Sequence, residues 1–220
     1  MARCVLILGI GCSGTSATAG VLHKLGCPMG RAGHLTHRPN GMGYYEDKCF
    51  YGQFTHAEDD AATRTRFRLL FKKHRTEPLW GWKNTLTYKV LPWMLGAIEE
   101  WGDEPYCVAV HRTFYASVRG RGQGKCGKYA GTFAHDIDGE FSRAASEAWA
   151  AEAMGDYWRA LGGIRDRGTP LHHLSFEYLV AEPELEVERI VQFAFEGMER
   201  PDPETIRSAV EHIQIGEVHN

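Results

Sequence analysis

The residues whose types and spacing best suit chemistry lie near the amino terminus, in the segment GIGCSGTS at residues 9–16. Its glycines let the backbone curl so that successive N–H groups point inward, and Ser13, Thr15 and Ser16 supply hydroxyl donors. An apolar run precedes this segment at residues 4–8, and a helical pattern follows at residues 15–25. The loop would therefore open onto the positive end of a helix, and we predict that it binds an anion.

The glycine spacing narrows the choice of anion. Gly9 and Gly14 have the separation of the GxxxxGK[ST] loop of nucleoside triphosphatases, but Thr15 occupies the lysine position. That lysine offsets charge on the β and γ phosphates, so its absence argues against ATP or GTP chemistry and favours a less charged ligand end. The alternative to anion binding is a glycine turn that only joins a strand to a helix.

The elements that must position this loop follow from the apolar pattern. Runs of strand length occur at residues 4–8, 79–82, 106–110 and 171–176, with helical patterns at residues 92–101, 139–161, 183–195 and from 202 onward. This alternation predicts a three-layer α/β/α sandwich around a mainly parallel central sheet, in one domain spanning residues 1–220. Residues 120–139 contain six glycines and are predicted to form a mobile loop, of a length that often covers a site.

Composition excludes several classes of function. A net charge of −3 gives no whole-chain footprint for nucleic acid, and no apolar run approaches the roughly 20 residues that span a bilayer. The six cysteines form no CxxC pair, which predicts reduced thiols and a cytoplasmic protein. His34 and His37 lack the further ligands of a metal site, so no metal is expected.

Four later segments complete the pattern. They are NGMGYYED at residues 40–47, WGWKN at 80–84, VHR at 110–112 and LSFEYLVAEP at 174–183. With the GIGCSGTS loop they resemble, in order, the motifs of the P-loop sulfotransferase superfamily, in its bacterial or phage-like type. The resemblance covers most of the chain and implies the nucleotide fold and a sulfotransferase that uses 3′-phosphoadenylyl sulfate (PAPS) without a metal.

The resemblance also implies cofactor-binding residues. The 5′-phosphosulfate would contact the loop residues Gly11, Cys12, Ser13, Gly14, Thr15 and Ser16. Arg112 would hold the 3′-phosphate, a role that suits the paired donors of a guanidinium group. The family places a serine where this chain has Gly120, so Ser117 is the nearest substitute, and Cys12 stands where relatives often carry a basic residue.

Sulfuryl transfer needs a base for the acceptor proton and a cation for the leaving phosphate. We predict Glu46 as the base, the alternative being a solvated glutamate on a loop. Lys83 is the candidate cation, the alternative being a lysine stacked on Trp82 at a strand end. His111, beside Arg112, is a second candidate base, although a histidine at a strand end is often structural.

The acceptor is not specified by the sequence beyond a small molecule, carbohydrate or lipid with a hydroxyl or amine. Residues 64–75 form a basic stretch that is predicted to be helical. It is either a solvated amphipathic face or a contact surface for an anionic acceptor. Two other functions stay open. One is a P-loop nucleotide or small-molecule kinase; the other is a catalytically silent module that binds phosphorylated adenosine.

Overall fold

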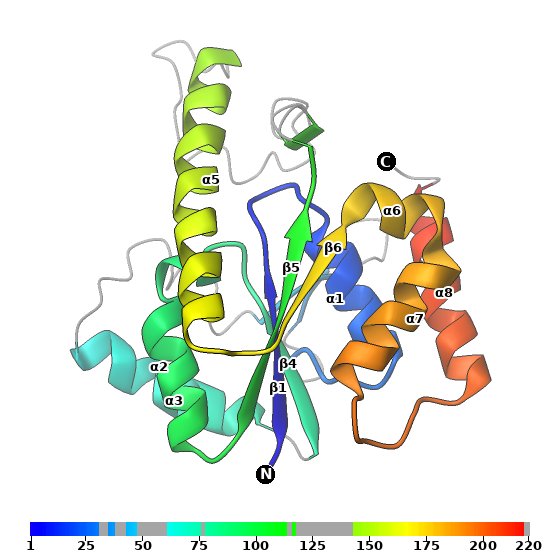
Figure 1. The fold of residues 1–220 in the computed structure, drawn as a ribbon, viewed down its shortest axis with the longest axis horizontal. Coiled ribbons are helices and arrows are strands. Elements are labelled where there is room, and N and C mark those ends of the chain that lie inside the picture. Colours follow the sequence, from blue (N-terminus) through cyan, green and yellow to red (C-terminus); the bar gives the residue numbers. More distant parts are fainter. Residues whose placement is uncertain are drawn as a thin grey trace.

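The computed structural model describes residues 1–30, 35–37, 43–47, 61–75, 78–113, 116–117 and 143–217. Its centre is a four-stranded sheet in the order β4-β1-β5-β6, formed by β1 (Arg3–Leu8), β4 (Leu79–Lys83), β5 (Glu104–His111) and β6 (Leu171–Ser175). All three strand pairs are parallel. The carboxyl ends of the strands therefore meet at one edge, toward the top of Figure 1. A second, antiparallel pair joins β2 (Leu35–His37) and β3 (Gly43–Asp47).

Helices cover both faces of the central sheet (Figure 1). One layer contains α2 (Ala61–His74), α3 (Leu91–Glu100) and the long α5 (Arg143–Asp166), with the short helix η1 (Thr87–Lys89) beside α5. The other layer contains α1 (Thr15–Lys24), α6 (Phe176–Ala181), α7 (Pro183–Ala194) and α8 (Pro203–Glu217). The predicted three-layer α/β/α sandwich with a parallel sheet is confirmed.

The core is split by the sheet because β1 is buried along its whole length and its side chains alternate between the faces. Cys4, Leu6 and Leu8 pack with the α2, α3 and α5 layer, whereas Val5 and Ile7 pack with the α1, α7 and α8 layer. A continuous apolar run without polar alternation is what such a doubly covered strand requires.

The last strand and the long helix are among the elements whose boundaries differ from the predictions. The strand predicted at residues 171–176 ends one residue earlier, because Ser175 caps α6 by accepting a hydrogen bond from the Tyr178 N–H, and Phe176 begins that helix. The predicted helix at residues 139–161 is described from Arg143 and runs on to Asp166. The glycine-rich segment at residues 120–139 lies outside the described residues.

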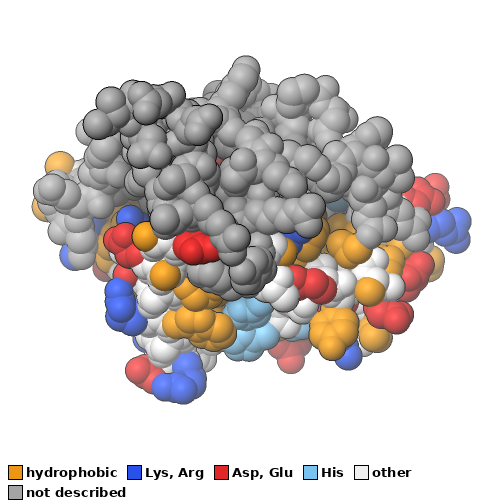
Figure 2. All heavy atoms as spheres, turned by 90° about the horizontal axis from the view of Figure 1, so that it is seen from above, with side chains coloured by type: hydrophobic (Ala, Val, Ile, Leu, Met, Phe, Trp, Pro, Cys, Tyr) orange, Lys and Arg blue, Asp and Glu red, His pale blue; other side chains and the backbone are white. Residues whose placement is uncertain are grey.

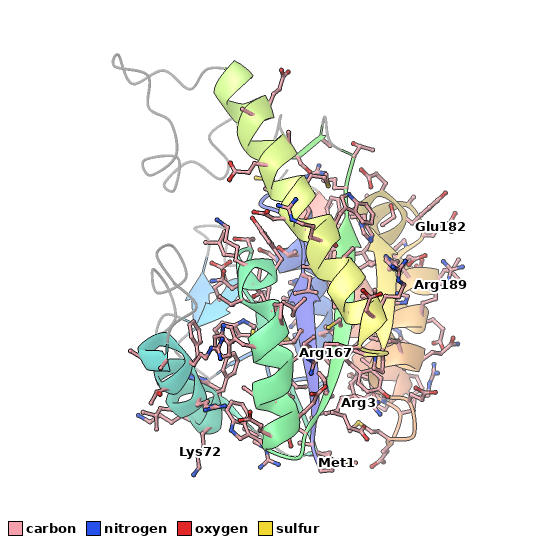
Figure 3. The ribbon with its side chains drawn as sticks, turned by 60° about the vertical axis from the view of Figure 1, so that its left-hand side comes forward. Met1, Arg3, Lys72, Arg167, Glu182 and Arg189 are labelled. Carbon is pink, nitrogen blue, oxygen red and sulfur yellow. The ribbon has the colours of Figure 1, made fainter. Side chains whose placement is uncertain are left out.

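The amino-terminal edge of the sheet is held by a buried carboxylate. Asp103 accepts two hydrogen bonds from Arg75 at 2.6 and 2.7 Å, one from the Ala2 N–H at 3.1 Å and one from Trp80 Nε1 at 3.2 Å. Nearby, Arg3 of β1 lies against the ring of Tyr106 at this same end of the sheet (Figure 3). Burial alone would raise the pKa of Asp103, but its hydrogen bonds and the Arg75 charge hold it below the ordinary value.

No helix in the described part of the chain is long and apolar enough to cross a membrane.

Candidate functional site

The loop between β1 and α1 is curled so tightly that two of its positions require glycine. At Gly9 a Cβ atom would lie 2.5 Å from Ser13 Oγ and 3.1 Å from the Val110 carbonyl oxygen. Gly14 has φ 97°, and a Cβ there would lie 2.1 Å from the Phe176 ring. Glycine alone combines the left-handed backbone with this close approach. The loop is thus a fixed cradle at the start of α1, as the sequence predicted.

Two buried hydroxyls near this edge have no hydrogen-bond partner within the residues that the structure describes. Ser13 is 1% exposed and sits inside the loop, and Ser117 is fully buried in the helical turn after β5. Buried polar groups in folded proteins are almost always paired, because an unpaired donor or acceptor costs free energy. Both hydroxyls were predicted to contact ligand phosphates, and a ligand oxygen would satisfy each of them.

A buried ammonium group reaches the same loop from the neighbouring strand. Lys83 ends β4, which pairs with β1 so that Ile7 and Lys83 are in register. Its side chain is 2% exposed, and Nζ donates to Ser16 Oγ at 3.2 Å and to Glu46 Oε1 at 2.7 Å. The parallel pairing of β4 and β1 places this cation at the first turn of α1. The structure therefore joins Lys83, Glu46 and Ser16 in one cluster.

Glu46 comes to this cluster from β3, not from a solvated loop. Its side chain is 12% exposed and ion-paired with Lys83. The alternative of a solvated glutamate is excluded by this burial. The alternative of a Lys83 that only stacks on Trp82 is likewise excluded, because its Nζ donates to Ser16 and Glu46.

Arg112 follows β5 and closes the loop from the other side. Its Nη1 donates to the Cys12 carbonyl oxygen at 3.0 Å, and its guanidinium lies over the Phe176 ring, 4.8 Å from the centroid. The stacking and the backbone contact hold the guanidinium at the loop, and within the described residues its other N–H groups make no hydrogen bond.

Glu177 supports Arg112 in a role that sequence reasoning missed. Its Oε1 accepts from the Thr113 N–H at 3.0 Å and its Oε2 from Ser175 Oγ at 3.1 Å. Burial alone would raise the pKa of Glu177, but these hydrogen bonds and the Arg112 charge lower it. The carboxylate thus ties α6 to the residue that follows Arg112. The LSFEYLVAEP motif was the available signal, and it pointed to the family but not to this contact.

His111 lies on the opposite face of the sheet from Arg112. Its Nε2 is 2.8 Å from His173 Nδ1, and its ring stacks on Trp158 of α5 with centroids 5.4 Å apart. Figure 2, which views the molecule from the side of the carboxyl ends of the strands, shows histidine side chains beside hydrophobic ones. Burial and the neighbouring His173 lower the pKa of His111. The structure brings Glu46 and Lys83 together and places His111 with α5 and β6 instead.

The remaining sequence predictions concern the cysteines and metal binding. Cys12 is disulfide-bonded, whereas Cys4, Cys27 and Cys107 are buried free thiols. The three free thiols agree with the prediction of reduced cysteines, whereas Cys12 does not, and its partner lies outside the described residues. In the described ranges, no three His, Cys, Asp or Glu side chains are grouped to hold a metal.

The basic stretch forms α2, with Phe67, Phe71 and His74 buried, whereas Arg64, Arg68, Lys72 and Lys73 are exposed. Arg68 pairs with Glu100, and Lys72 projects away from the sheet (Figure 3). This is the arrangement of a solvated amphipathic helix, and contact with an acceptor stays a prediction.

Solved structures share this architecture. The chain superposes on mouse sulfotransferase SULT7A1 complexed with PAP (adenosine 3′,5′-bisphosphate) over 99% of its length and 67% of that chain, with a TM-score of 0.57 and 12% identity. A sulfotransferase domain from the curacin biosynthetic pathway matches over 93% of this chain and 77% of that one, with a TM-score of 0.54 and 15% identity. No protein-family model matches the sequence, and no curated protein matches it in sequence. The chain has the P-loop sulfotransferase-type fold.

Proposed function

We propose that this protein is a sulfotransferase that moves the sulfuryl group of PAPS to an acceptor hydroxyl or amine. The observation that carries the proposal is the convergence, at a glycine-built loop, of the buried Lys83 ammonium, the Glu46 carboxylate and the unpaired Ser13 hydroxyl. The sulfotransferase fold supports it, as does PAP in the mouse sulfotransferase structure.

The loop would bind the 5′-phosphosulfate. The loop leads into the positive end of α1, where backbone N–H groups favour an anion, and Ser13, Thr15 and Ser16 add hydroxyls. Residues 11–16 are thus the proposed cofactor contacts, with Thr15 in place of a lysine that a triphosphate would need. Arg112 and Ser117 would bind the 3′-phosphate, because both follow β5 and offer a fixed guanidinium and an unpaired hydroxyl.

Glu46 and Lys83 would carry out the transfer. PAPS, when bound, supplies a sulfur centre attached to an oxygen of the 5′-phosphate. Glu46 would accept the proton of the acceptor through Oε2 as the acceptor atom bonds to sulfur and the bond from sulfur to the phosphate oxygen breaks. Lys83 would stabilise the negative charge that this oxygen gains.

Lys83 would also supply the positive charge that is missing at position 12. Relatives often carry a basic side chain there, and this chain has a disulfide-bonded cysteine. Lys83 Nζ already lies 3.2 Å from Ser16 Oγ, at the first turn of α1. One cation at the reacting end of the loop would suffice if it is buried, because electrostatic stabilisation is stronger away from water.

A ligand screen by thermal shift tests the proposal. We expect adenosine 3′,5′-bisphosphate to raise the melting temperature and ATP with Mg²⁺ to have little effect. In a second assay, we expect labelled sulfate to be transferred from PAPS to members of a library of hydroxyl and amine acceptors. Stabilisation by ATP with Mg²⁺ alone would instead indicate a kinase. Stabilisation by the bisphosphate without any transfer would indicate the silent binding module.

A further inference from the structure

Tyr45, the residue before Glu46, has an unusual backbone. Its φ is 55°, and among the described residues only Cys12, in the cofactor loop, is another non-glycine residue with positive φ. A tyrosine rarely adopts the left-handed region, because its Cβ crowds the neighbouring carbonyl oxygen. Such a conformation persists only where the surroundings hold it, and it is most common at functional sites.

The surroundings of Tyr45 are two helices that pack on each other. The Tyr45 ring is 8% exposed and lies between His23 of α1 and His212 of α8, with ring centroids at 5.5 and 6.1 Å. His212 in turn packs on the α1 backbone, because a Cβ at Gly20 would lie 1.9 Å from its Nε2. The phenol ring is therefore fixed by α1, which begins at the cofactor loop, and by the carboxyl-terminal helix.

The next residue turns the other way. Glu46 leaves Tyr45 toward β4, where its Oε1 meets Lys83 Nζ at 2.7 Å. Rotation about the N–Cα bond of Tyr45 moves its ring and the following peptide unit together, so the left-handed φ determines how both are directed from the preceding residues of β3. With those residues unmoved, an extended φ would carry the ring away from His23 and His212 and the Glu46 carboxylate away from Lys83.

We propose that Tyr45 is a positioning residue that sets the Glu46 carboxylate on Lys83, and that α8 takes part in the active site by holding the Tyr45 ring. This inference rests on the proposed sulfotransferase function for its kinetic consequence. The structural part, the coupling of Tyr45 to the Glu46–Lys83 pair, can be measured without any activity.

Substitutions at position 45 distinguish the contribution of the ring from that of the backbone conformation. Tyr45→Phe keeps both ring contacts and should retain a transfer rate within about twofold of the original. Tyr45→Ala loses the ring and disfavours positive φ, so kcat should fall at least about tenfold with KM for PAPS nearly unchanged. Tyr45→Gly loses the ring but favours positive φ, so its kcat should exceed that of the alanine variant.

Tyr106 supplies the matched control. It is equally buried, at 8% exposed, but lies in β5 against Arg3 and Phe193 and has no positive φ. Tyr106→Ala and Tyr106→Gly should both lower stability, with glycine the worse of the two, and leave kcat of the folded protein unchanged. If glycine were also the worse residue at position 45, in both kcat and melting temperature, Tyr45 would be an ordinary packing residue and the proposal would be wrong.

The deciding experiment is a double-mutant cycle on Glu46→Gln and Lys83→Met, measured by chemical unfolding. We expect the two positions to be coupled by at least about tenfold in the unfolding constant in the Tyr45 and Tyr45→Phe backgrounds, and by less than about twofold in Tyr45→Ala. Equal coupling in all three backgrounds overturns the inference. If this pattern holds but the protein neither binds the bisphosphate nor transfers sulfate, the proposed function fails while the positioning role of Tyr45 stands.

Discussion

The two edges of the central sheet differ in the pairing of particular buried groups, a carboxylate at one edge and two hydroxyls at the other. At the amino-terminal edge, Asp103 receives four hydrogen bonds from within the protein, from Arg75, Ala2 and Trp80. At the carboxyl edge, Ser13 and Ser117 are buried hydroxyls without a partner in the described part of the chain. A buried polar group that is unpaired in the folded protein costs free energy, and a ligand that hydrogen-bonds to it can remove this cost. The hydrogen bonds of Asp103 thus contribute to stability, whereas we propose that the two hydroxyls contribute to ligand binding.

Lys83→Met should have the largest effect on function. Loss of one preorganised cation at the reacting end of the loop is expected to lower the transfer rate by about 100- to 1000-fold. Single-turnover transfer from labelled PAPS measures this rate directly. The exposed Lys72→Met on α2 removes a charge of the same kind and should leave the rate unchanged. A Lys83→Met enzyme that keeps its rate would remove Lys83 from the mechanism.

Asp103→Asn should have the largest effect on stability. It weakens charge-assisted hydrogen bonds to a buried group and is expected to cost about 2–3 kcal/mol in the free energy of unfolding, without change in bisphosphate affinity. Urea unfolding and calorimetric titration give the two values. A fall in affinity that matches the fall in stability would mean that the two edges are not separate.

The Asp103 effect should depend on pH. The folded protein holds the pKa of Asp103 below its ordinary value of 3.8, so as the pH falls the unfolded chain takes up this proton first and unfolding becomes easier. The contribution is complete above the ordinary value and is lost as the pH falls through the lower, folded-state pKa. The difference in stability between the original protein and Asp103→Asn should therefore shrink in acid, and a constant difference down to the lowest pH would refute this.

Arg112→Ala should act on binding more than on folding. The guanidinium makes one backbone hydrogen bond and one ring contact within the protein, at partly exposed positions. Its removal is expected to weaken the bisphosphate by about 10- to 100-fold, in line with a charge-assisted contact, while 5′-AMP loses little. Equal losses for the two nucleotides would place Arg112 away from the 3′-phosphate.

Ser13→Ala should have the smallest effect. The directions in which it changes the melting temperature and the bisphosphate affinity are informative. Removal of a buried, unpaired hydroxyl should leave the melting temperature unchanged or slightly higher, whereas bisphosphate affinity should fall by about threefold to tenfold. A Ser16→Ala variant is the matched comparison, since that hydroxyl already accepts from Lys83. Lower stability in Ser13→Ala would show that its hydroxyl is satisfied within the protein.

Local signals made much of this site predictable. A doubly buried strand, a glycine loop and a helix are adjacent in sequence, so their geometry follows from the chain itself. Lys83 and Arg112 could be placed because each follows a parallel strand, and such strands end at one edge. Glu46 was predicted from its motif, yet its position depends on the pairing of β3 with β2 and on the contact with Lys83 of β4. No local pattern at residues 43–47 indicates these contacts.

The residues that sequence reasoning missed act through distant contacts. Glu177 joins α6 to the turn after β5, and Phe176, predicted as the end of a strand, packs on Gly14 and under Arg112. The left-handed φ of Tyr45 is set by rings from α1 and α8. His111 is the opposite case. Arg112, the next residue in the sequence, lies at the candidate site, whereas the His111 side chain faces the other side of the sheet.

The most direct test of the central claim is the calorimetric affinity of the unmodified protein for adenosine 3′,5′-bisphosphate, compared with 5′-AMP and with ATP plus Mg²⁺. A loop without the triphosphate lysine, together with Arg112 and Ser117 after β5, predicts that the bisphosphate binds at least about tenfold more tightly than either competitor, since each charge-assisted contact to the 3′-phosphate adds about 1.5–3 kcal/mol. Binding of ATP with Mg²⁺ as tight as or tighter than that of the bisphosphate would contradict the account.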